Sequence, residues 1–199
     1  MRPLLSSKWA KVFVFALCLM PLLLLGWRGY RQDLGANPIE FITHATGTWT
    51  LRFLVFTLAV TPFRKLLKLP ELIKFRRMLG LFAFFYGCLH LTTYLWLDKF
   101  FDWREILKDV EKRRFIMAGF TGYVAMVPLA ITSTTGWIRR LGGKRWQRLH
   151  RLVYLSPIAG VVHYYWLVKS DIRQPALYGF LVGILLLYRV AVWKRLIII

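Results

Sequence analysis

The sequence predicts an all-α integral membrane protein: a single domain in which six transmembrane helices form a bundle, with both termini in the cytoplasm. Three observations carry this prediction: the apolar composition, the spacing of six apolar runs and the uneven distribution of basic residues. The chain has 199 residues, 57% of them hydrophobic, and a mean hydropathy of +0.48. A water-soluble core of this size cannot bury so much apolar surface, so we expect lipid to be the solvent.

Each apolar run approaches the length of about 20 residues that a helix needs to cross a bilayer. The second run is the shortest and needs flanking residues as far as Leu67. We find no internal repeat or linker and therefore predict one domain over residues 1–199. The six runs are Val12–Trp27, Trp49–Phe63, Met78–Leu97, Phe115–Thr132, Leu152–Val168 and Ala176–Trp193.

The basic residues gather on alternate connections. If the N-terminus lies inside, the cytoplasmic segments hold eighteen of the 29 Lys and Arg residues but one acid, Glu71. Short basic loops of this kind stay on the cytoplasmic side and attract anionic lipid. A net charge of +20 would otherwise raise nucleic acid as a partner, and we expect none. The eighteen are Arg2, Lys8, Lys11, Arg64, Lys65, Lys68, Lys74, Arg76, Arg77, Arg139, Arg140, Lys144, Arg145, Arg148, Arg151, Arg189, Lys194 and Arg195.

Two histidines fall inside the runs. His90 lies eight residues before Asp98 in the third run, and His163 lies six residues before Lys169 in the fifth. Odd-numbered spans cross the membrane in the same direction, so both imidazoles are expected at one depth, toward the outer face. An ionisable side chain at membrane depth is costly and marks a functional site by default. Two imidazoles from neighbouring helices are what a six-coordinate haem iron takes as axial ligands.

Other roles remain open for this pair. Each histidine could instead hydrogen-bond a neighbouring helix, which is the more common role of a single buried histidine. Zinc is a weaker alternative, because it usually takes four thiolate, imidazole or carboxylate ligands and no third candidate lies at that depth.

A third histidine, His150, stands at the inner end of the fifth run, 13 residues before His163. The same offset counted back from His90 reaches Arg77, which stays protonated and rarely binds iron. On an ideal helix 13 residues leave two positions about 140° apart in azimuth and about 20 Å apart along the axis. Pro157 can bend the fifth run and so change the angle between His150 and His163. The third run has no such proline. The outer pair is therefore better supported than an inner one.

Arginines near the inner ends suit a different role. Arg76, Arg77, Arg148 and Arg151 are expected to pair with haem propionates or lipid phosphates. His44, in the predicted outer loop before the second run, is expected to be an interfacial hydrogen-bonding group. The connector 102–114 mixes five positive with four negative residues and carries large apolar side chains, so it is either an amphipathic surface helix or a solvated loop.

Several ordered strings of the sequence resemble the MsrQ (YedZ) family. They are Thr61-Pro62-Phe63-Arg64, Arg76-Arg77-Met78-Leu79-Gly80-Leu81 leading to Leu89-His90-Leu91, and Trp146-Gln147-Arg148-Leu149-His150-Arg151-Leu152-Val153-Tyr154 leading to His163-Tyr164-Tyr165-Trp166. The resemblance covers nearly the whole chain, including Leu34-Gly35-Ala36-Asn37-Pro38 and Thr132-Ser133.

The resemblance implies a multi-pass cytochrome b of the bacterial inner membrane, within the ferric-reductase-like transmembrane group. It implies one or two b-type haems, with His90, His163 and His150 as candidate iron ligands. Electrons would come from the quinone pool or a flavin and pass to MsrP, a periplasmic molybdenum-cofactor enzyme that reduces methionine sulfoxide. FMN is implied as a possible cofactor, but we find no nucleotide-binding motif.

The ferric-reductase pattern of two histidines on each of two helices is only partly met, because Arg77 stands where the fourth is expected. Two rival functions stay open: a stand-alone metal-ion (ferric) reductase and a non-redox membrane scaffold.

Overall fold

The protein is described by a computed structural model over residues 7–197, with side chains as far as Val192. Arg2 therefore lies outside the described residues, as do the side chains of Lys194 and Arg195. The described chain is helical without strands, and it divides into two compact units, residues 1–108 and 109–199. The principal helices are α2 (Lys8–Tyr30), α3 (Pro38–Leu66), α4 (Ile73–Thr92), α5 (Trp103–Lys112), α6 (Arg114–Ile131), α7 (Thr135–Leu141), α8 (Gly143–Leu149), α9 (Leu155–Leu167) and α10 (Arg173–Ile197).

The six apolar runs each fall on a long helical segment, with shifted boundaries. The second run was placed at Trp49–Phe63, but α3 already begins at Pro38, so His44 lies in a helix and not in a loop. Asn37 explains the earlier start, because its side chain accepts a hydrogen bond from the Glu40 N–H and caps the helix. Within residues 7–192, four helical segments are long and apolar enough to cross a membrane: those at Lys8–Tyr30, Pro70–Asp98, Arg114–Ile131 and Arg173–Val192.

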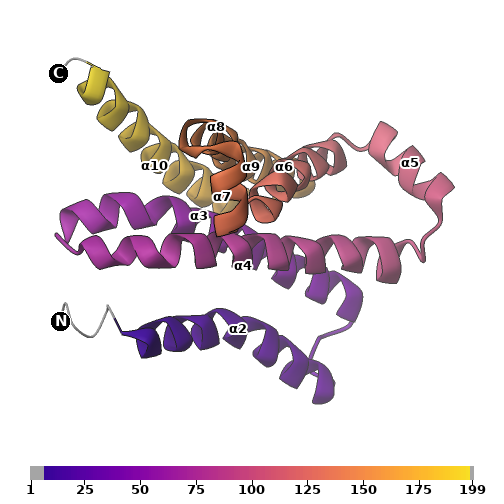
Figure 1. Cartoon of the computed structure of the whole chain (residues 1–199). Helices are drawn as coiled ribbons and strands as arrows, with labels where there is room; N and C mark the ends of the chain where they lie inside the picture. The colour runs from indigo at the N-terminus through magenta and orange to yellow at the C-terminus, as the bar shows by residue number, and fades with distance from the viewer. Residues whose placement is uncertain (1–6, 198–199) are drawn as a thin grey trace. The chain divides into compact units, whose positions relative to one another are not determined.

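The first unit is built on the antiparallel pair of α3 and α4 (Figure 1). Phe53 and Leu58 on α3 and Phe82 and Tyr86 on α4 form its buried centre. The ring of Phe53 stacks on those of Phe82 and Tyr86, with centroids 5.7 and 5.2 Å apart. Aromatic stacking of this kind adds to the stability that burial alone provides.

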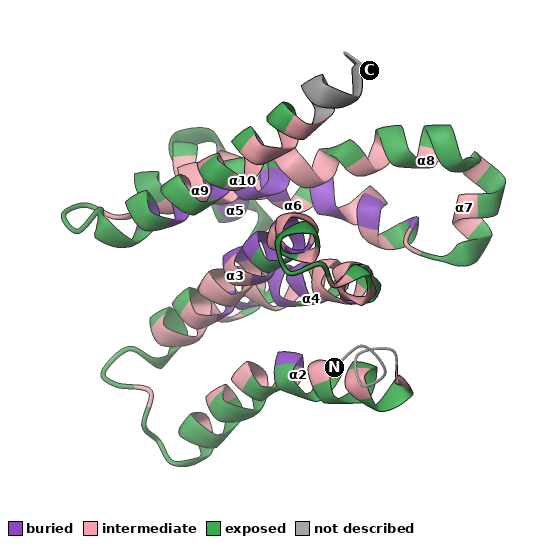
Figure 2. Ribbon diagram, turned by 90° about the vertical axis from the view of Figure 1, so that its left-hand side faces the viewer, coloured by how far each residue is buried: buried purple, intermediate pink, exposed green. Residues whose placement is uncertain are grey.

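Tyr86 also joins α4 to α2. Its hydroxyl donates to the Cys18 carbonyl at 3.0 Å and accepts from the Leu22 N–H at 3.1 Å. These two backbone groups are the pair that an uninterrupted helix would bond directly, and Pro21 lies between them. The tyrosine hydroxyl thus enters the hydrogen-bond ladder of α2 beside a proline, a recognised cause of helix bending. Elsewhere α2 is largely exposed (Figure 2).

The second unit is built on the antiparallel pair of α6 and α9, with α10 packed against α9. Gly122 on α6 permits the close approach, since a Cβ there would lie 3.2 Å from the Ala159 Cβ and from the Ser156 carbonyl oxygen. Ser156, Pro157 and Ala159 are accordingly buried on α9. Small residues at such a crossing allow membrane helices to pack through their backbones.

A 3₁₀ segment, η3 (His150–Tyr154), precedes α9 and packs on α6. The 13 residues of α9 alone span about 20 Å. Together with the 3₁₀ turns, which rise about 2 Å per residue, the length reaches about 30 Å, the thickness of a hydrocarbon core. α3 is long enough but carries Arg52 and several threonines. The six-span count and the cytoplasmic termini therefore stay predictions.

The connector between the units is a helix and not an unstructured loop. Asp102 caps α5, its carboxylate accepting from the N–H groups of Arg104 and Glu105. Trp103 and Leu107 are 61% and 69% exposed on this helix. Of the two alternatives for this connector, the structure therefore favours the amphipathic helix. The single domain over residues 1–199 stays a prediction.

Candidate functional site

His90 lies near the end of α4 and is half-buried against the start of α3. Its Nδ1 is 3.0 Å from the Thr43 carbonyl oxygen. Gly47, one turn further along α3, faces the ring so closely that a Cβ there would lie 3.0 Å from both Cε1 and Nδ1. Thr93 also contacts this site, since its hydroxyl donates to the His90 carbonyl at 2.7 Å and lies 3.1 Å from the Thr43 hydroxyl.

His163 lies on α9 and is held against the start of α6 in the same way. Its Nδ1 is 2.7 Å from the Phe115 carbonyl oxygen. Gly119, one turn after Phe115, faces the ring, and a Cβ there would lie 2.8 Å from Nδ1 and 3.1 Å from Cε1. Each unit therefore contains one histidine that is bonded to a helix carbonyl four residues before a glycine.

The bonding fixes which nitrogen of each ring carries hydrogen. A carbonyl oxygen only accepts, so Nδ1 of His90 and of His163 is the donor in both bonds. A neutral imidazole protonated at Nδ1 presents its lone pair at Nε2. Metal-binding histidines usually donate their second ring N–H to a carbonyl or carboxylate, which fixes the ring and raises its basicity. The residues present thus fit an iron-ligating role at Nε2.

His150 is held differently. Its Nε2 is 3.0 Å from the Thr132 hydroxyl, which itself bonds the Pro128 carbonyl at 2.6 Å. Because the one hydroxyl hydrogen is used on Pro128, the hydroxyl accepts and Nε2 of His150 donates. The ring also stacks on Trp146, with centroids 3.8 Å apart, and the indole N–H bonds the Thr132 carbonyl. His150 therefore presents the opposite ring nitrogen from His90 and His163.

Both histidines of the second unit contact α6, although 13 residues on an ideal helix would place them on different faces. The 3₁₀ segment resolves this, because each of its residues turns by about 120° and not 100°, which reduces the separation to about 40–60°. Pro157 contributes, since it lacks the N–H that would bond the Val153 carbonyl. Their partners on α6, Gly119 and Thr132, are about 20 Å apart along its axis.

In the first unit, no 3₁₀ segment between Arg77 and His90 changes the angle between the two residues. α4 is a regular helix from Ile73 to Thr92, so Arg77 and His90 remain about 140° apart. Arg77, Arg148 and Arg151 are exposed and Arg76 is half-buried. A haem propionate or a lipid phosphate can therefore reach these arginines from outside the helices. The roles of these arginines stay predictions.

Sequence reasoning missed the groups that hold the two rings: Gly47 with the Thr43 carbonyl, and Gly119 with the Phe115 carbonyl. A signal was present, because glycine is a poor helix former and each precedes its histidine by 43 or 44 positions. Arg52 was also missed. It lies inside the second apolar run, with its guanidinium 4.6 Å from the Trp49 ring centroid.

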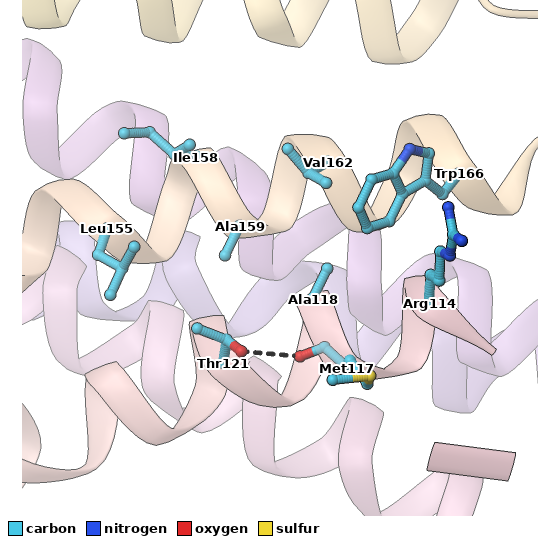
Figure 3. A pocket seen from close by; sticks show the side chains of 9 residues that line it. All are labelled: Arg114, Met117, Ala118, Thr121, Leu155, Ile158, Ala159, Val162 and Trp166. Carbon is cyan, nitrogen blue, oxygen red and sulfur yellow. Dashed lines mark hydrogen bonds between the residues drawn. The ribbon is translucent and has the colours of Figure 1, made fainter. Parts of the chain in front are cut away.

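An apolar groove of about 360 Å³ runs between α6 and α9 within the second unit (Figure 3). Arg114 and Trp166 lie close together at one end, and small side chains such as Ala118 and Ala159 line its length. None of the three candidate histidines lines this groove. The groove is therefore a feature separate from the imidazoles.

Known proteins resemble the chain over most of its length. The family described as "Ferric reductase like transmembrane component" matches residues 13–161. A protein-methionine-sulfoxide reductase heme-binding subunit MsrQ from Herminiimonas arsenicoxydans is 56% identical, over 93% of this chain and 86% of its own. Proteins of the same name from Caulobacter vibrioides and Xanthomonas campestris are each 51% identical, the former over 92% of this chain and 87% of its own and the latter over 94% and 87%.

The matched region contains the α3–α4 pair, His90 and all of α6, whereas His163 lies two residues beyond it. The MsrQ relatives extend the similarity across nearly all of the chain at an identity that leaves no doubt about common descent. The chain therefore belongs to the ferric-reductase-like transmembrane family and, within it, to the MsrQ family of membrane proteins.

Proposed function

We propose that this protein is the haem-binding membrane subunit of a bacterial protein-methionine-sulfoxide reductase system. Its place is the inner membrane, where it passes electrons from the quinone pool or a flavin to MsrP, the periplasmic molybdenum-cofactor reductase. The names of the relatives support the haem and the system. The observation that carries the proposal in this chain is the matched bonding of His90 and His163 through Nδ1 to backbone carbonyls.

His90 and His163 are the proposed axial ligands of one b-type haem, through Nε2. Bound haem supplies an iron that changes between the ferric and ferrous states and so holds one electron at a time. The protein orients both imidazoles through their Nδ1 bonds to backbone carbonyls. His150 is proposed as a ligand of a second haem. Its Nε2 donates to the Thr132 hydroxyl, so the ring has to rotate before Nε2 can face an iron.

Two other functions are possible for a chain of this family. A stand-alone ferric reductase would reduce soluble ferric chelates without a protein partner. A non-redox scaffold would bind no haem. The carbonyl bonds favour a redox role over a scaffold, because they prepare each ring for a metal, and the MsrQ relatives favour MsrP as acceptor over ferric ions.

The test is a reduced-minus-oxidised absorption spectrum of the purified protein, with haem quantified per chain. We expect a low-spin b-type signal from at least one haem per chain. The reduced protein should be reoxidised by MsrP in the presence of methionine sulfoxide, and not by ferric chelates at a comparable rate. A preparation that folds but contains no haem would falsify the proposal, whereas fast reoxidation by ferric chelates alone would favour the ferric reductase.

Electrons are proposed to leave at α5, whose exposed surface combines charges with Trp103 and Leu107. Replacing Arg104 and Lys108 together with glutamate should slow reoxidation by MsrP, because complementary charges mainly raise the rate of encounter. The haem spectrum should be unchanged. Stopped-flow reoxidation measures this effect, and Lys169→Glu on another connector is the control. Equal rates in all three proteins would remove α5 from the route.

A further inference from the structure

The most informative feature outside the histidines themselves is a local arrangement that occurs once in each unit. In both, a histidine of one helix donates from Nδ1 to the carbonyl of a residue on the neighbouring helix, and a glycine follows that residue by four positions. The first set is Thr43, Gly47 and His90, and the second is Phe115, Gly119 and His163. We call each set a cradle.

The glycine is what lets the ring reach the carbonyl. In an α-helix the carbonyl of residue i bonds the N–H of residue i+4, so the side chain of residue i+4 stands beside that carbonyl. In both cradles residue i+4 is the glycine. A Cβ would lie 3.0 Å from the ring of His90 and 2.8 Å from Nδ1 of His163. A larger residue at either position would therefore require the ring to shift from its place at the carbonyl.

The bond between imidazole and carbonyl has a defined chemical consequence. It commits Nδ1 as the donor and so leaves the lone pair of a neutral ring on Nε2, and it limits the rotation of the ring about its Cβ–Cγ bond. Groups that act on a ligand in this way usually change metal affinity by about 10- to 100-fold when they are lost. They also tune the electronic properties of a haem, since ligand orientation and hydrogen bonding affect its potential.

We propose that Gly47 and Gly119 are positioning residues, which orient the imidazoles of His90 and His163 for iron through the carbonyls of Thr43 and Phe115. The inference rests on the proposed function, because it assumes that the two histidines bind haem. It goes beyond that function by assigning a role to two glycines and by predicting that the two units present their ligands through the same local geometry. Each imidazole is then oriented by the glycine and the carbonyl of its own cradle, so each can be altered by a separate substitution.

Gly47→Ala and Gly119→Ala test the proposal in the full-length protein. Both should lower haem affinity, by about 10- to 100-fold if the bond is lost, and both should shift the midpoint potential and the g values of the ferric haem. Gly119→Ala should have the larger effect, because its methyl group would lie closer to the ring. Gly47→Ala requires the smaller displacement and serves as the second variant if Gly119→Ala does not fold.

The chain offers matched controls. Gly122→Ala affects the same helix as Gly119, but its Cβ meets Ala159 and the Ser156 carbonyl and not a histidine. It should lower thermal stability and leave the potential and the electron paramagnetic resonance spectrum unchanged. Gly80→Ala on α4 meets only the Thr57 side chain at 3.7 Å or more, and it should change neither property.

The outcomes separate the two proposals. If the wild-type protein binds no haem, the proposed function fails and the positioning role fails with it. If the wild type binds haem, but Gly47→Ala and Gly119→Ala keep the same haem content, potential and g values, the positioning role is wrong and the function stands. If Gly122→Ala shifts the spectrum as much as Gly119→Ala does, the effect is one of helix packing and the positioning role is likewise wrong.

Discussion

At the scale of single residues, the three candidate histidines differ in the ring nitrogen that they commit to the protein. His90 and His163 donate from Nδ1 to carbonyls, whereas His150 donates from Nε2 to a hydroxyl. In a sequence all three are equivalent imidazoles near the ends of apolar runs. Proton counting on the neighbouring oxygens separates them, because a carbonyl cannot donate and a threonine hydroxyl has one hydrogen.

Alanine at His90 or at His163 should abolish or strongly reduce the main haem signal, because a six-coordinate iron loses an axial nitrogen. The reduced-minus-oxidised spectrum measures this loss. His44→Ala is the control, since His44 is exposed on α3, and its spectrum should match the wild type. Full haem content with unchanged spectra in both the His90 and the His163 variants would show that the pairing is wrong.

At the scale of helices, irregular turns decide which side chains meet. The 3₁₀ segment before α9 brings His150 and His163 onto the same neighbour, α6, while the regular α4 keeps Arg77 off the face of His90. A π-helical segment, η2 (Thr93–Asp98), begins three residues after His90, and the Thr93 hydroxyl donates to the His90 carbonyl. Such segments are frequent at functional sites.

Tyr86→Phe tests the contact between α2 and α4. The variant loses the hydroxyl that bridges Cys18 and Leu22, and we expect the free energy of unfolding to fall by about 0.6–2 kcal/mol. Thermal or denaturant unfolding in detergent measures this change, with Tyr30→Phe as control because Tyr30 is 81% exposed. The haem spectrum should not change. Equal stability of the two variants would show that the hydroxyl does not hold α2.

At the scale of the whole molecule, the distribution of charge predicts the orientation in the membrane. The connector at α5 should face the periplasm. The turn between α7 and α8, where Gly142 has a φ of 74° and basic residues flank it on both sides, should face the cytoplasm. Reporter fusions at Lys112 and at Gly142 measure both positions. A cytoplasmic reporter signal from the α5 fusion would overturn this topology and, with it, electron exit at α5.

Much of this protein follows from the sequence by itself. The six apolar runs predicted where the long helices lie, because hydropathy is a property of consecutive residues. The strings around His90, His150 and His163 predicted the family, which the relatives confirm. The boundary of the second run was wrong, since the cap at Asn37 extends the helix through a polar stretch that hydropathy does not detect.

The support of the imidazoles was decided by the tertiary structure alone. The bonds from His90 to Thr43 and from His163 to Phe115 join residues 47 and 48 positions apart. No local pattern encodes which carbonyl a ring will meet, because that depends on how two helices cross and on the absence of a Cβ at Gly47 and Gly119. The histidines proposed as ligands are thus visible in the sequence, whereas the ring nitrogen that each one commits to the protein is set by packing.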